Sequence, residues 1–536
     1  MKIGDLIKYA ARAEPEKIGL ITDSGRYTFQ QLYEFCNSLA NGLVQMNFKV
    51  GDRVALLLRN GLEIIVSFFG VPRMGAIVVP LNYKMAKNEL VYCLNDSTPK
   101  MLIYGEEYED MIEYLQGECK SIEYFVSPAE FQKIITSYSK EGPTDLNGKR
   151  IKLSNKNTLF LMYTGGTTGF PKGVMLSHKN ITSTMAASAG KMLSDVKNYS
   201  EEKRLRQVER MEKREGIFMT DLPIFHAAAM FTVIVAMYGA TPMVTHKRFD
   251  PIYTYETIEK EKVTNLELVP TMLIRLLEAY DPKYDISSLQ TIFYGAAAID
   301  PTTLKKALEV FKNVEFLQVF GMTETAVPVT TLTSEDHELI RDEERDELLR
   351  SAGKAIAGVE IKIVDEMRNE LPIGEIGEIV VRGEGIMQGY WNKEEKTKSV
   401  IDEDGWYYTG DMGKLDEKGY LYVMDRAKDM IVSGGENIYS AEVENAIYKH
   451  QAVKLCAVIG IPDDKWGEAV CAYIVKKEGY ELTGEEIIQH CKEYIASYKK
   501  PKRIIFIRKL PMSPQGKILK KILREKHWKD KERKVI

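Results

Sequence analysis

The stretch TGGTTGFPKG, residues 164–173, combines four glycines and three threonines with a single lysine. Glycine lets backbone amides turn toward an anion, threonine hydroxyls add donors, and Lys172 adds a compact positive charge. The stretch is not a Walker loop, because that loop places Ser or Thr directly after its lysine, whereas Gly173 follows Lys172. Two interpretations remain: a clasp for a phosphate tail, or a flexible turn between two strands.

Short apolar runs lie on both sides of this loop and recur up to about residue 330. We predict strands at 53–58, 76–81, 158–163, 242–246 and 291–295. The helical spacing of apolar residues predicts helices at 271–280 and 302–312. Strands that alternate with helices favour a mostly parallel α/β sheet with helices on its faces.

The pattern changes after about residue 355, where glycines separate short strands at 359–366, 377–385 and 419–425. Such strands are typical of antiparallel hairpins. The last part of the chain mixes strands and helices. The predicted fold class is therefore α/β, with a large N-terminal domain of layered α/β sheets and a small antiparallel subdomain (1–425). A smaller α+β C-terminal domain (426–536) follows it.

Composition narrows the function classes. The chain has 536 residues, 44% hydrophobic and 28% charged, as in ordinary globular proteins, and its formal net charge of −4 gives no reason to expect nucleic acid. The six cysteines form no C-x-x-C pair, which favours reduced thiols in a cytoplasmic protein. The start of the chain has no apolar core of a signal peptide, and we expect no transmembrane segment.

Three further segments could carry chemistry. In VFGMTET, residues 319–325, Glu324 offers an oxygen ligand of the kind that Mg²⁺ takes, at a strand end where α/β sheets place ligands. Asp411 and Arg426 flank a hairpin-like turn and could grip a ribose, or could form an exposed ion pair. Lys517 follows Gly516 in MSPQGKILKK. Each segment alone is also consistent with an ordinary polar loop.

Together, and in this order, the segments resemble motifs of the adenylate-forming superfamily, which includes acyl-CoA synthetases, firefly luciferases and peptide-synthetase adenylation domains. The matching motifs are YTGGTTGFPKGVMLSH, GMTET, GWYYTGD, DRAKDMIVSGGENIYSAEVE and PQGKI, and the resemblance spans roughly residues 27–521. The segment SGGENIY is most similar to the acyl-CoA ligase branch.

The resemblance implies a reaction in two halves. A carboxylate attacks the α-phosphate of Mg·ATP and gives an acyl-adenylate and pyrophosphate. A thiol, commonly that of coenzyme A, then displaces AMP. ATP, Mg²⁺ and coenzyme A are therefore the expected cofactors, and a small carboxylic acid is the expected substrate. A homodimer is left open.

The resemblance also implies a nucleotide site. The loop residues would hold the departing phosphates, Gly295 to Ala297 and the ring of Phe320 would flank adenine, Thr323 would touch the α-phosphate, Glu324 would hold Mg²⁺, and Asp411 with Arg426 would grip the ribose. Most relatives carry Tyr where Phe320 stands. The expected nucleotide-binding residues are Thr164, Gly165, Gly166, Thr167, Thr168, Gly169, Lys172, Gly295, Ala296, Ala297, Phe320, Gly321, Met322, Thr323, Asp411 and Arg426.

Lys517 is the expected catalytic lysine, in contact with the carboxylate and the α-phosphate in the transition state. Lys428 matches the position at which the C-terminal domain rotates between the half-reactions, which makes that domain a mobile lid. Gly434 and Gly435 would let the pantetheine arm of coenzyme A pass, and Asn437 would keep an amide near AMP. One departure is Val432, which stands where plant-type ligases of aromatic acids carry a second lysine.

The acid is less closely specified. His226 stands where amino-acid-activating relatives carry an aspartate, which disfavours an α-amino acid. Lys517, Glu324 and His226 form the expected catalytic set. The small or apolar neighbours Ala227, Ala228, Ala229, Met230 and Val269 could line a hydrophobic acyl pocket or form plain core.

The leading hypothesis is an acyl-CoA ligase that acts on a hydrophobic carboxylic acid, a medium- or long-chain fatty acid before others. The alternatives are a ligase of aryl acids, an adenylation enzyme that loads an acyl carrier protein, and a nucleotide-binding sensor without turnover.

Overall fold

The computed structural model describes residues 2–164, 171–196, 216–342, 345–426, 429–433, 436–463, 466–513 and 516–528. For residues 190–196, 425–426 and 436–437 the description covers the backbone. Within the glycine-rich loop 164–173, residues 165–170 lie outside the described residues.

The largest sheet combines strands from both ends of the N-terminal domain. Its strand order is β15 (Lys354–Ala355), β14 (Thr330–Leu332), β13 (Glu315–Phe320), β12 (Thr291–Gly295), β11 (Asn265–Leu268), β9 (Phe218–Thr220), β10 (Met243–Val244), β1 (Ile18–Thr22) and β2 (Gly25–Thr28). The pairs from β13 to β1 are parallel, and β2, β14 and β15 add antiparallel edges. The carboxyl ends of the parallel strands thus meet at one edge.

A second sheet packs beside the first. Its order is β18 (Gly389–Tyr390), β8 (Lys172–Ser177), β7 (Thr158–Thr164), β4 (Ile77–Pro80), β3 (Arg53–Leu57), β5 (Met101–Tyr104) and β6 (Tyr124–Val126). Every residue of β4 and β5 is buried. Strands that are apolar along their whole length suit a parallel sheet whose two faces are both covered.

Two antiparallel sheets complete the chain. The first contains β16 (Glu360–Val364), β17 (Gly377–Arg382), β19 (Tyr407–Leu415) and β20 (Leu421–Arg426). The C-terminal sheet contains β22 (Glu436–Ile438), β21 (Ile431–Ser433), β24 (Gly467–Lys476) and β23 (Val453–Asp463), and β25 (Arg503–Phe506) joins β24 in parallel. Apolar side chains on both faces of this last sheet give the C-terminal domain a core of its own.

The helices cover the sheets. They are α1 (Leu6–Ala13), α2 (Phe29–Gln45), α3 (Leu62–Arg73), α4 (Lys87–Ser97), α5 (Glu109–Glu118), α6 (Pro128–Ser137), α7 (His178–Val196), α9 (Ala227–Tyr238), α10 (Pro251–Glu261), α11 (Pro270–Ala279), α12 (Pro301–Val310), α13 (Ser334–Arg341), α14 (Glu394–Val400), α15 (Ser440–Tyr448), α16 (Gly484–Tyr494) and α17 (Lys520–Glu525).

Local sequence signals fix several helix starts. The hydroxyl of Thr28 accepts from the backbone N–H of Gln31, whose side chain accepts from the N–H of Thr28, so that α2 begins in a capping box. The carboxylate of Asp300 accepts from the N–H of Thr303, and Pro301 occupies the first turn of α12.

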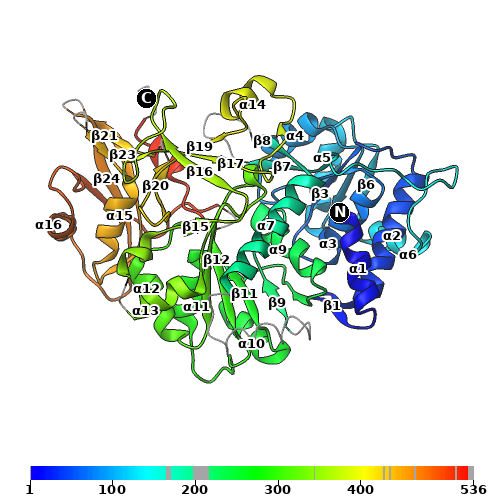
Figure 1. Cartoon of the computed structure of the whole chain (residues 1–536), viewed down its shortest axis with the longest axis horizontal. Coiled ribbons are helices and arrows are strands. Elements are labelled where there is room, and N and C mark those ends of the chain that lie inside the picture. Colours follow the sequence, from blue (N-terminus) through cyan, green and yellow to red (C-terminus); the bar gives the residue numbers. More distant parts are fainter. Residues whose placement is uncertain are drawn as a thin grey trace.

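Figure 1 shows how these parts are arranged. Helices α2 and α6 lie at one end of the molecule, and β23, β24 and α16 lie at the other, with the largest sheet between them. The ion pair between Lys454 of β23 and Glu278 of α11, with 2.8 Å between Nζ and Oε1, joins the C-terminal domain to the large domain.

The predicted fold class is confirmed: a large N-terminal α/β domain with an antiparallel sheet is followed by a smaller C-terminal domain. The predicted strand at 242–246 is shorter than expected, because pairing in β10 is limited to Met243 and Val244. Between β20 and β21 the chain passes from one sheet to another, and the domain boundary at residue 425 stays a prediction.

A tight crossing links the largest sheet to the antiparallel sheet and gives a stability prediction. Gly353 has φ +86°, and a Cβ there would overlap the carbonyl group of Thr331. Gly353→Ala is expected to lower the free energy of unfolding by at least about 3 kcal/mol, from strain and overlap together. Gly358→Ala is the matched control, since φ is +73° and a Cβ would meet nothing within 4 Å.

Thermal or denaturant unfolding of both variants checks this expectation. The control is expected to lose about 1 kcal/mol from backbone conformation alone. Equal losses in the two variants would contradict the overlap at Gly353.

Candidate active site

A cavity of about 1800 Å³ lies where loops at the carboxyl ends of β11, β12 and β13 face the C-terminal segment around residues 512–524. Strand ends of this kind are the usual ligand sites of open α/β sheets. The predicted site residues in its wall are Thr164, His226, Gly295, Ala296, Ala297, Phe320, Gly321, Met322, Thr323, Glu324, Asp411 and Lys517.

Eight other predicted site residues lie outside the described residues: Gly165, Gly166, Thr167, Thr168, Gly169, Lys428, Gly434 and Gly435. Arg426 and Asn437 are described by their backbone alone. Arg426 pairs with Asp411 across β19 and β20. Asp411 is buried and lines the cavity, so the interpretation of its carboxylate as one half of an exposed ion pair is wrong.

Glu324 and Lys172 both contact Tyr390, a residue that the sequence did not identify as part of the site. The hydroxyl of Tyr390 donates to Glu324 Oε1 over 3.1 Å, and Lys172 Nζ lies 5.2 Å from the centre of the Tyr390 ring. Burial and the charge of Lys396 lower the pKa of Lys172, whereas the Glu324 carboxylate opposes them. One tyrosine at the edge of the site thus contacts a cation with its ring and a carboxylate with its hydroxyl.

The backbone of the cavity wall is strained. Ala296, Ala326 and Val327 have φ of +66°, +52° and +70°, in a region that non-glycine residues rarely adopt and that a β-branched residue adopts least. Each such residue costs on the order of 1–3 kcal/mol, and such strain collects at functional sites. Two of the three, Ala296 and Val327, line the cavity directly.

His226 and Lys517 come together although 291 residues separate them in the sequence. Burial and the nearby Lys517 charge lower the pKa of His226 to about 3, so the imidazole is neutral at neutral pH. The loop of Lys517 is closed by Ser513: its N–H donates to Lys517 O over 2.7 Å, and its Oγ accepts from Lys517 N over 3.1 Å.

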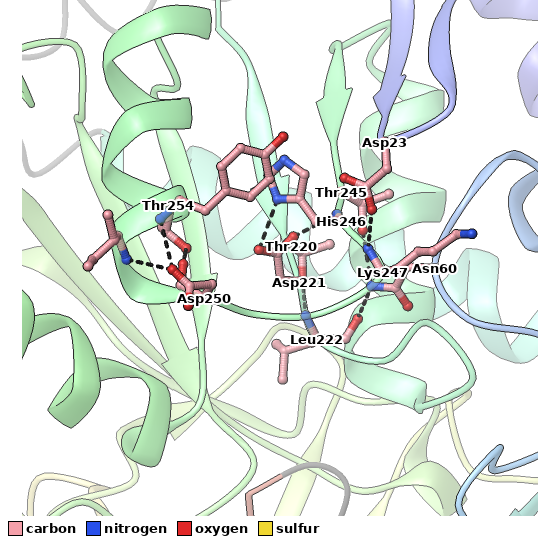
Figure 2. Close-up of polar contacts among 12 residues, drawn as sticks. Asp23, Asn60, Thr220, Asp221, Leu222, Thr245, His246, Lys247, Asp250 and Thr254 are labelled. Carbon is pink, nitrogen blue, oxygen red and sulfur yellow. Dashed lines mark hydrogen bonds and ion pairs between the residues drawn. The ribbon is translucent and has the colours of Figure 1, made fainter.

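A polar network fixes the loop that leads to His226 (Figure 2). Asn60 Nδ2 donates to Leu222 O over 2.9 Å and to Thr245 Oγ1 over 3.0 Å. Asn60 Oδ1 accepts from Ile224 N over 2.9 Å. All of these groups are buried or nearly so, where an unpaired polar group is costly. The loop therefore has one well-defined path into α9.

A buried carboxylate–imidazole pair holds the other side of this loop (Figure 2). The backbone N–H of His246 donates to Asp221 Oδ1 over 2.8 Å, and the ring Nδ1 of His246 lies 3.1 Å from Asp221 Oδ2. Burial lowers the pKa of His246, but the hydrogen bond and charge of Asp221 outweigh it and raise the pKa overall. No sequence spacing joins residues 60, 221 and 246, and only the fold brings them together.

The apolar residues after His226 divide between cavity and core. Ala227, Ala228 and Val269 line the cavity. Ala229 and Met230 are fully buried in the main core instead, so an acyl-pocket role for these two is wrong. The difference follows from helix geometry, because α9 turns successive side chains by about 100° and presents one face to the cavity.

The cavity continues beyond these residues, between α9 and the face of the largest sheet. Its wall there includes Phe231 and Ala236 of α9, Phe293 of β12 and Leu317 of β13. Two carboxyls interrupt this wall. Glu315 of β13 is half-buried, whereas Glu267 of β11 is buried, which raises its pKa to about 7.

The described residues contain no group of three or more His, Cys, Asp or Glu side chains that could hold a metal ion. Glu324 is therefore not part of a protein cage, and a single carboxylate is the donor set that suits Mg²⁺ carried on a phosphate ligand. All six cysteines are free and buried. Among the described helices, none combines the length and hydropathy needed to cross a bilayer.

Comparison with known families gives two matches along the chain. Residues 7–391 match the family described as AMP-binding enzyme, and residues 442–517 match the AMP-binding enzyme C-terminal domain.

Individual relatives agree over nearly the whole chain. It is 32% identical to a long-chain-fatty-acid–CoA ligase, FadD13, of Mycobacterium tuberculosis, over 98% of both chains. It is 34% identical to a feruloyl-CoA synthase of an Amycolatopsis species, over 95% of this chain and 96% of the relative. The crystal structure of ATP-bound MatB from Rhodopseudomonas palustris matches with a TM-score of 0.84 and 28% identity, over 99% of both chains.

The buried carboxyl in the cavity wall gives a prediction about pH. Since the pKa of Glu267 is raised from 4.5 to about 7 in the folded protein, folding favours the protonated acid. Its contribution to stability is complete below pH 4.5 and is lost as the pH rises through about 7. Glu267→Gln is expected to gain up to about 3 kcal/mol over the unsubstituted protein between pH 4.5 and pH 8.

Urea unfolding of both proteins across this pH range measures the difference. Two curves of free energy against pH that run parallel would show that Glu267 has an ordinary pKa.

Proposed function

The chain belongs to the adenylate-forming superfamily as an AMP-binding enzyme and an acid–thiol ligase, and from this premise we propose that it activates a hydrophobic carboxylic acid, a medium- or long-chain fatty acid, for transfer to coenzyme A. The observation that carries the proposal is the meeting of Lys517, Glu324 and His226 in the wall of one cavity that continues as an apolar space.

The first half-reaction brings two anions together, the carboxylate of the acid and the α-phosphate of ATP. Stabilisation therefore requires positive charge where negative charge builds up in the transition state. Lys517 supplies that charge from the C-terminal side of the cavity. The neutral His226 lies beside it at the start of α9, where it can orient the carboxylate without adding a competing charge.

We assign the remaining nucleotide contacts by position. Thr323 would donate to the α-phosphate, Asp411 with Arg426 would hold the ribose, and Gly295 to Ala297 with the ring of Phe320 would enclose adenine. The phosphates that leave would lie against Thr164, Lys172 and the loop between them. The support for this assignment is that the described members of the set share one cavity or, like Lys172, its edge.

Mg²⁺ fits the donor chemistry of Glu324, which offers one carboxylate near Lys172 and the phosphate loop. When bound, the ion would neutralise charge on the triphosphate oxygens. The hydroxyl of Tyr390 would orient the carboxylate through its hydrogen bond to Oε1.

The second half-reaction needs access for a thiol. Lys517 occupies the cavity in the arrangement described here, so the C-terminal domain, residues 426–536, would have to turn about Lys428 before coenzyme A enters. Gly434 and Gly435 would then border the pantetheine path, and Asn437 would stay near AMP. A cytoplasmic location is part of the same proposal.

An aryl acid is the second candidate for the substrate. A feruloyl-CoA synthase stands beside a long-chain-fatty-acid–CoA ligase among the relatives, at similar identity. A fatty acid is favoured because the apolar wall follows α9 as far as Val235 and Tyr238, both exposed at the surface, which suits an elongated ligand. Release of AMP with a panel of fatty and aryl acids, with coenzyme A or a carrier protein as acceptor, tests the choice of acid and of thiol.

Lys517→Ala separates the two half-reactions. The variant is expected to lose at least about 100-fold in acid-dependent exchange of pyrophosphate into ATP, because the charge that offsets the meeting anions is gone. Thioester formation from synthetic acyl-adenylate and coenzyme A is expected to change less than about three-fold, since Lys517 has left the site by then.

The two rates are measured on the same enzyme preparation, with the melting temperature as a check on folding. A similar loss in both half-reactions would remove Lys517 from its assigned role.

A further inference from the structure

A carboxyl lies in the middle of the acyl cavity, where a plain hydrocarbon chain has nothing to pair with it. Glu267 on β11 sits in register with Thr220 on one side and with Phe293 on the other, and Phe293 pairs with Leu317. Side chains alternate along strands, so these residues share one face of the sheet. Glu267 is the ionisable member of this row.

The row lies below the adenine end of the site. Gly295 and Val319, which line the nucleotide part of the cavity, are two residues further along β12 and β13 than Phe293 and Leu317. Two residues of strand span about 6.6 Å. If the acid extends from the nucleotide end along this face of the sheet, as the proposed function requires, Glu267 would face its body and not its carboxylate. Thr232 of α9 also lines this region.

The environment of Glu267 is unusual for a carboxyl. The side chain is 9% exposed, and its Oε2 has no hydrogen-bond partner among the described residues. Hydrogen bonds from Thr220 and Thr232 favour the charged form, but burial outweighs them and raises the pKa. A buried oxygen without a partner costs about 1–3 kcal/mol, so a ligand group that pairs with it would relieve that cost.

We propose that Glu267 selects acids that carry a hydroxyl group on the acyl body, by exchanging hydrogen bonds with that hydroxyl inside the cavity. The inference rests on the proposed acyl-CoA ligase function and names its substrate class more closely. A protonated carboxyl can both donate to and accept from a hydroxyl, which has the same two capacities. A methylene chain has no hydrogen-bond donor or acceptor. A charged substituent on the acid is also disfavoured, because the neighbouring Phe293 and Leu317 carry no opposite charge.

A purely structural role for Glu267 makes a different prediction. The contacts of Glu267 with Thr220 and Thr232 would then only tie β11 to β9 and to α9. Removal of the carboxyl would weaken folding without changing the choice of acid. Selectivity between paired acids therefore distinguishes the two roles, whereas stability alone does not.

The experiment compares acids in matched pairs, with and without one hydroxyl. One arm uses straight-chain acids with the hydroxyl at successive carbons, and the other uses 3-phenylpropenoic acid and its ring-hydroxylated forms. The readout is the ratio of kcat/KM for AMP release with coenzyme A, hydroxylated acid over its partner. The unsubstituted enzyme is expected to favour at least one hydroxylated acid by about ten-fold or more, and the arm in which this occurs identifies an aliphatic or an aryl acid.

Two variants and one control follow. Glu267→Leu is expected to reverse the preference, because the hydroxyl then meets an apolar wall. Glu267→Gln, which keeps a donor and an acceptor, is expected to retain part of it and covers the case in which the leucine variant fails to fold. Glu259→Leu, on the exposed side of α10, is the matched control and is expected to leave the ratio as it is.

The inference is overturned if no hydroxylated acid is preferred, or if a preference persists in Glu267→Leu. Turnover of plain acids in that case would leave the ligase function intact. Absence of AMP release with every acid would overturn the proposed function, and the inference with it.

Discussion

The whole site depends on how closely one loop of the C-terminal domain approaches the large domain. Gly516, with φ +77°, lies so near Thr271 at the start of α11 that a Cβ there would overlap Thr271 Oγ1. Only a residue without a side chain permits this approach and this backbone conformation together. Because Lys517 comes next in the chain, the contact determines where its ammonium group lies, beside the half-buried imidazole of His226.

The large domain contributes the contacts that position His226 and shape the cavity opposite Lys517. Asn60 and the Asp221–His246 pair fix the loop that presents His226, and the strained backbone at Ala296 and Val327 shapes the opposite wall. The strained backbone costs stability that the surrounding core must offset, whereas the buried polar groups avoid such a cost because they are hydrogen-bonded. The site is thus rigid on the large domain and completed by a single loop from the smaller one.

The sequence predicted the parts of this arrangement that are encoded locally. Apolar strand patterns, Pro301 at a helix start and the glycine-rich loop each act within a few residues, so they can be recognised without the fold. Tyr390, Asn60 and Glu267 could not be found in this way, because their roles arise from contacts between distant strands. The sequence also could not predict which side of α9 faces the cavity. All residues of α9 near His226 are apolar, so hydropathy could not separate Ala228 in the cavity wall from Met230 in the core.

In this account the approach of Gly516 to Thr271 places Lys517 for adenylation. The most direct test compares Gly516→Ala with Gly479→Ala, a glycine of the same domain with φ +79° and no atom within 4 Å of an added Cβ. Gly516→Ala is expected to lose acid-dependent pyrophosphate exchange by at least about ten-fold, the factor that corresponds to about 1.4 kcal/mol, while Gly479→Ala is expected to change it little. Equal exchange rates in the two variants would show that the contact between Gly516 and Thr271 does not place Lys517.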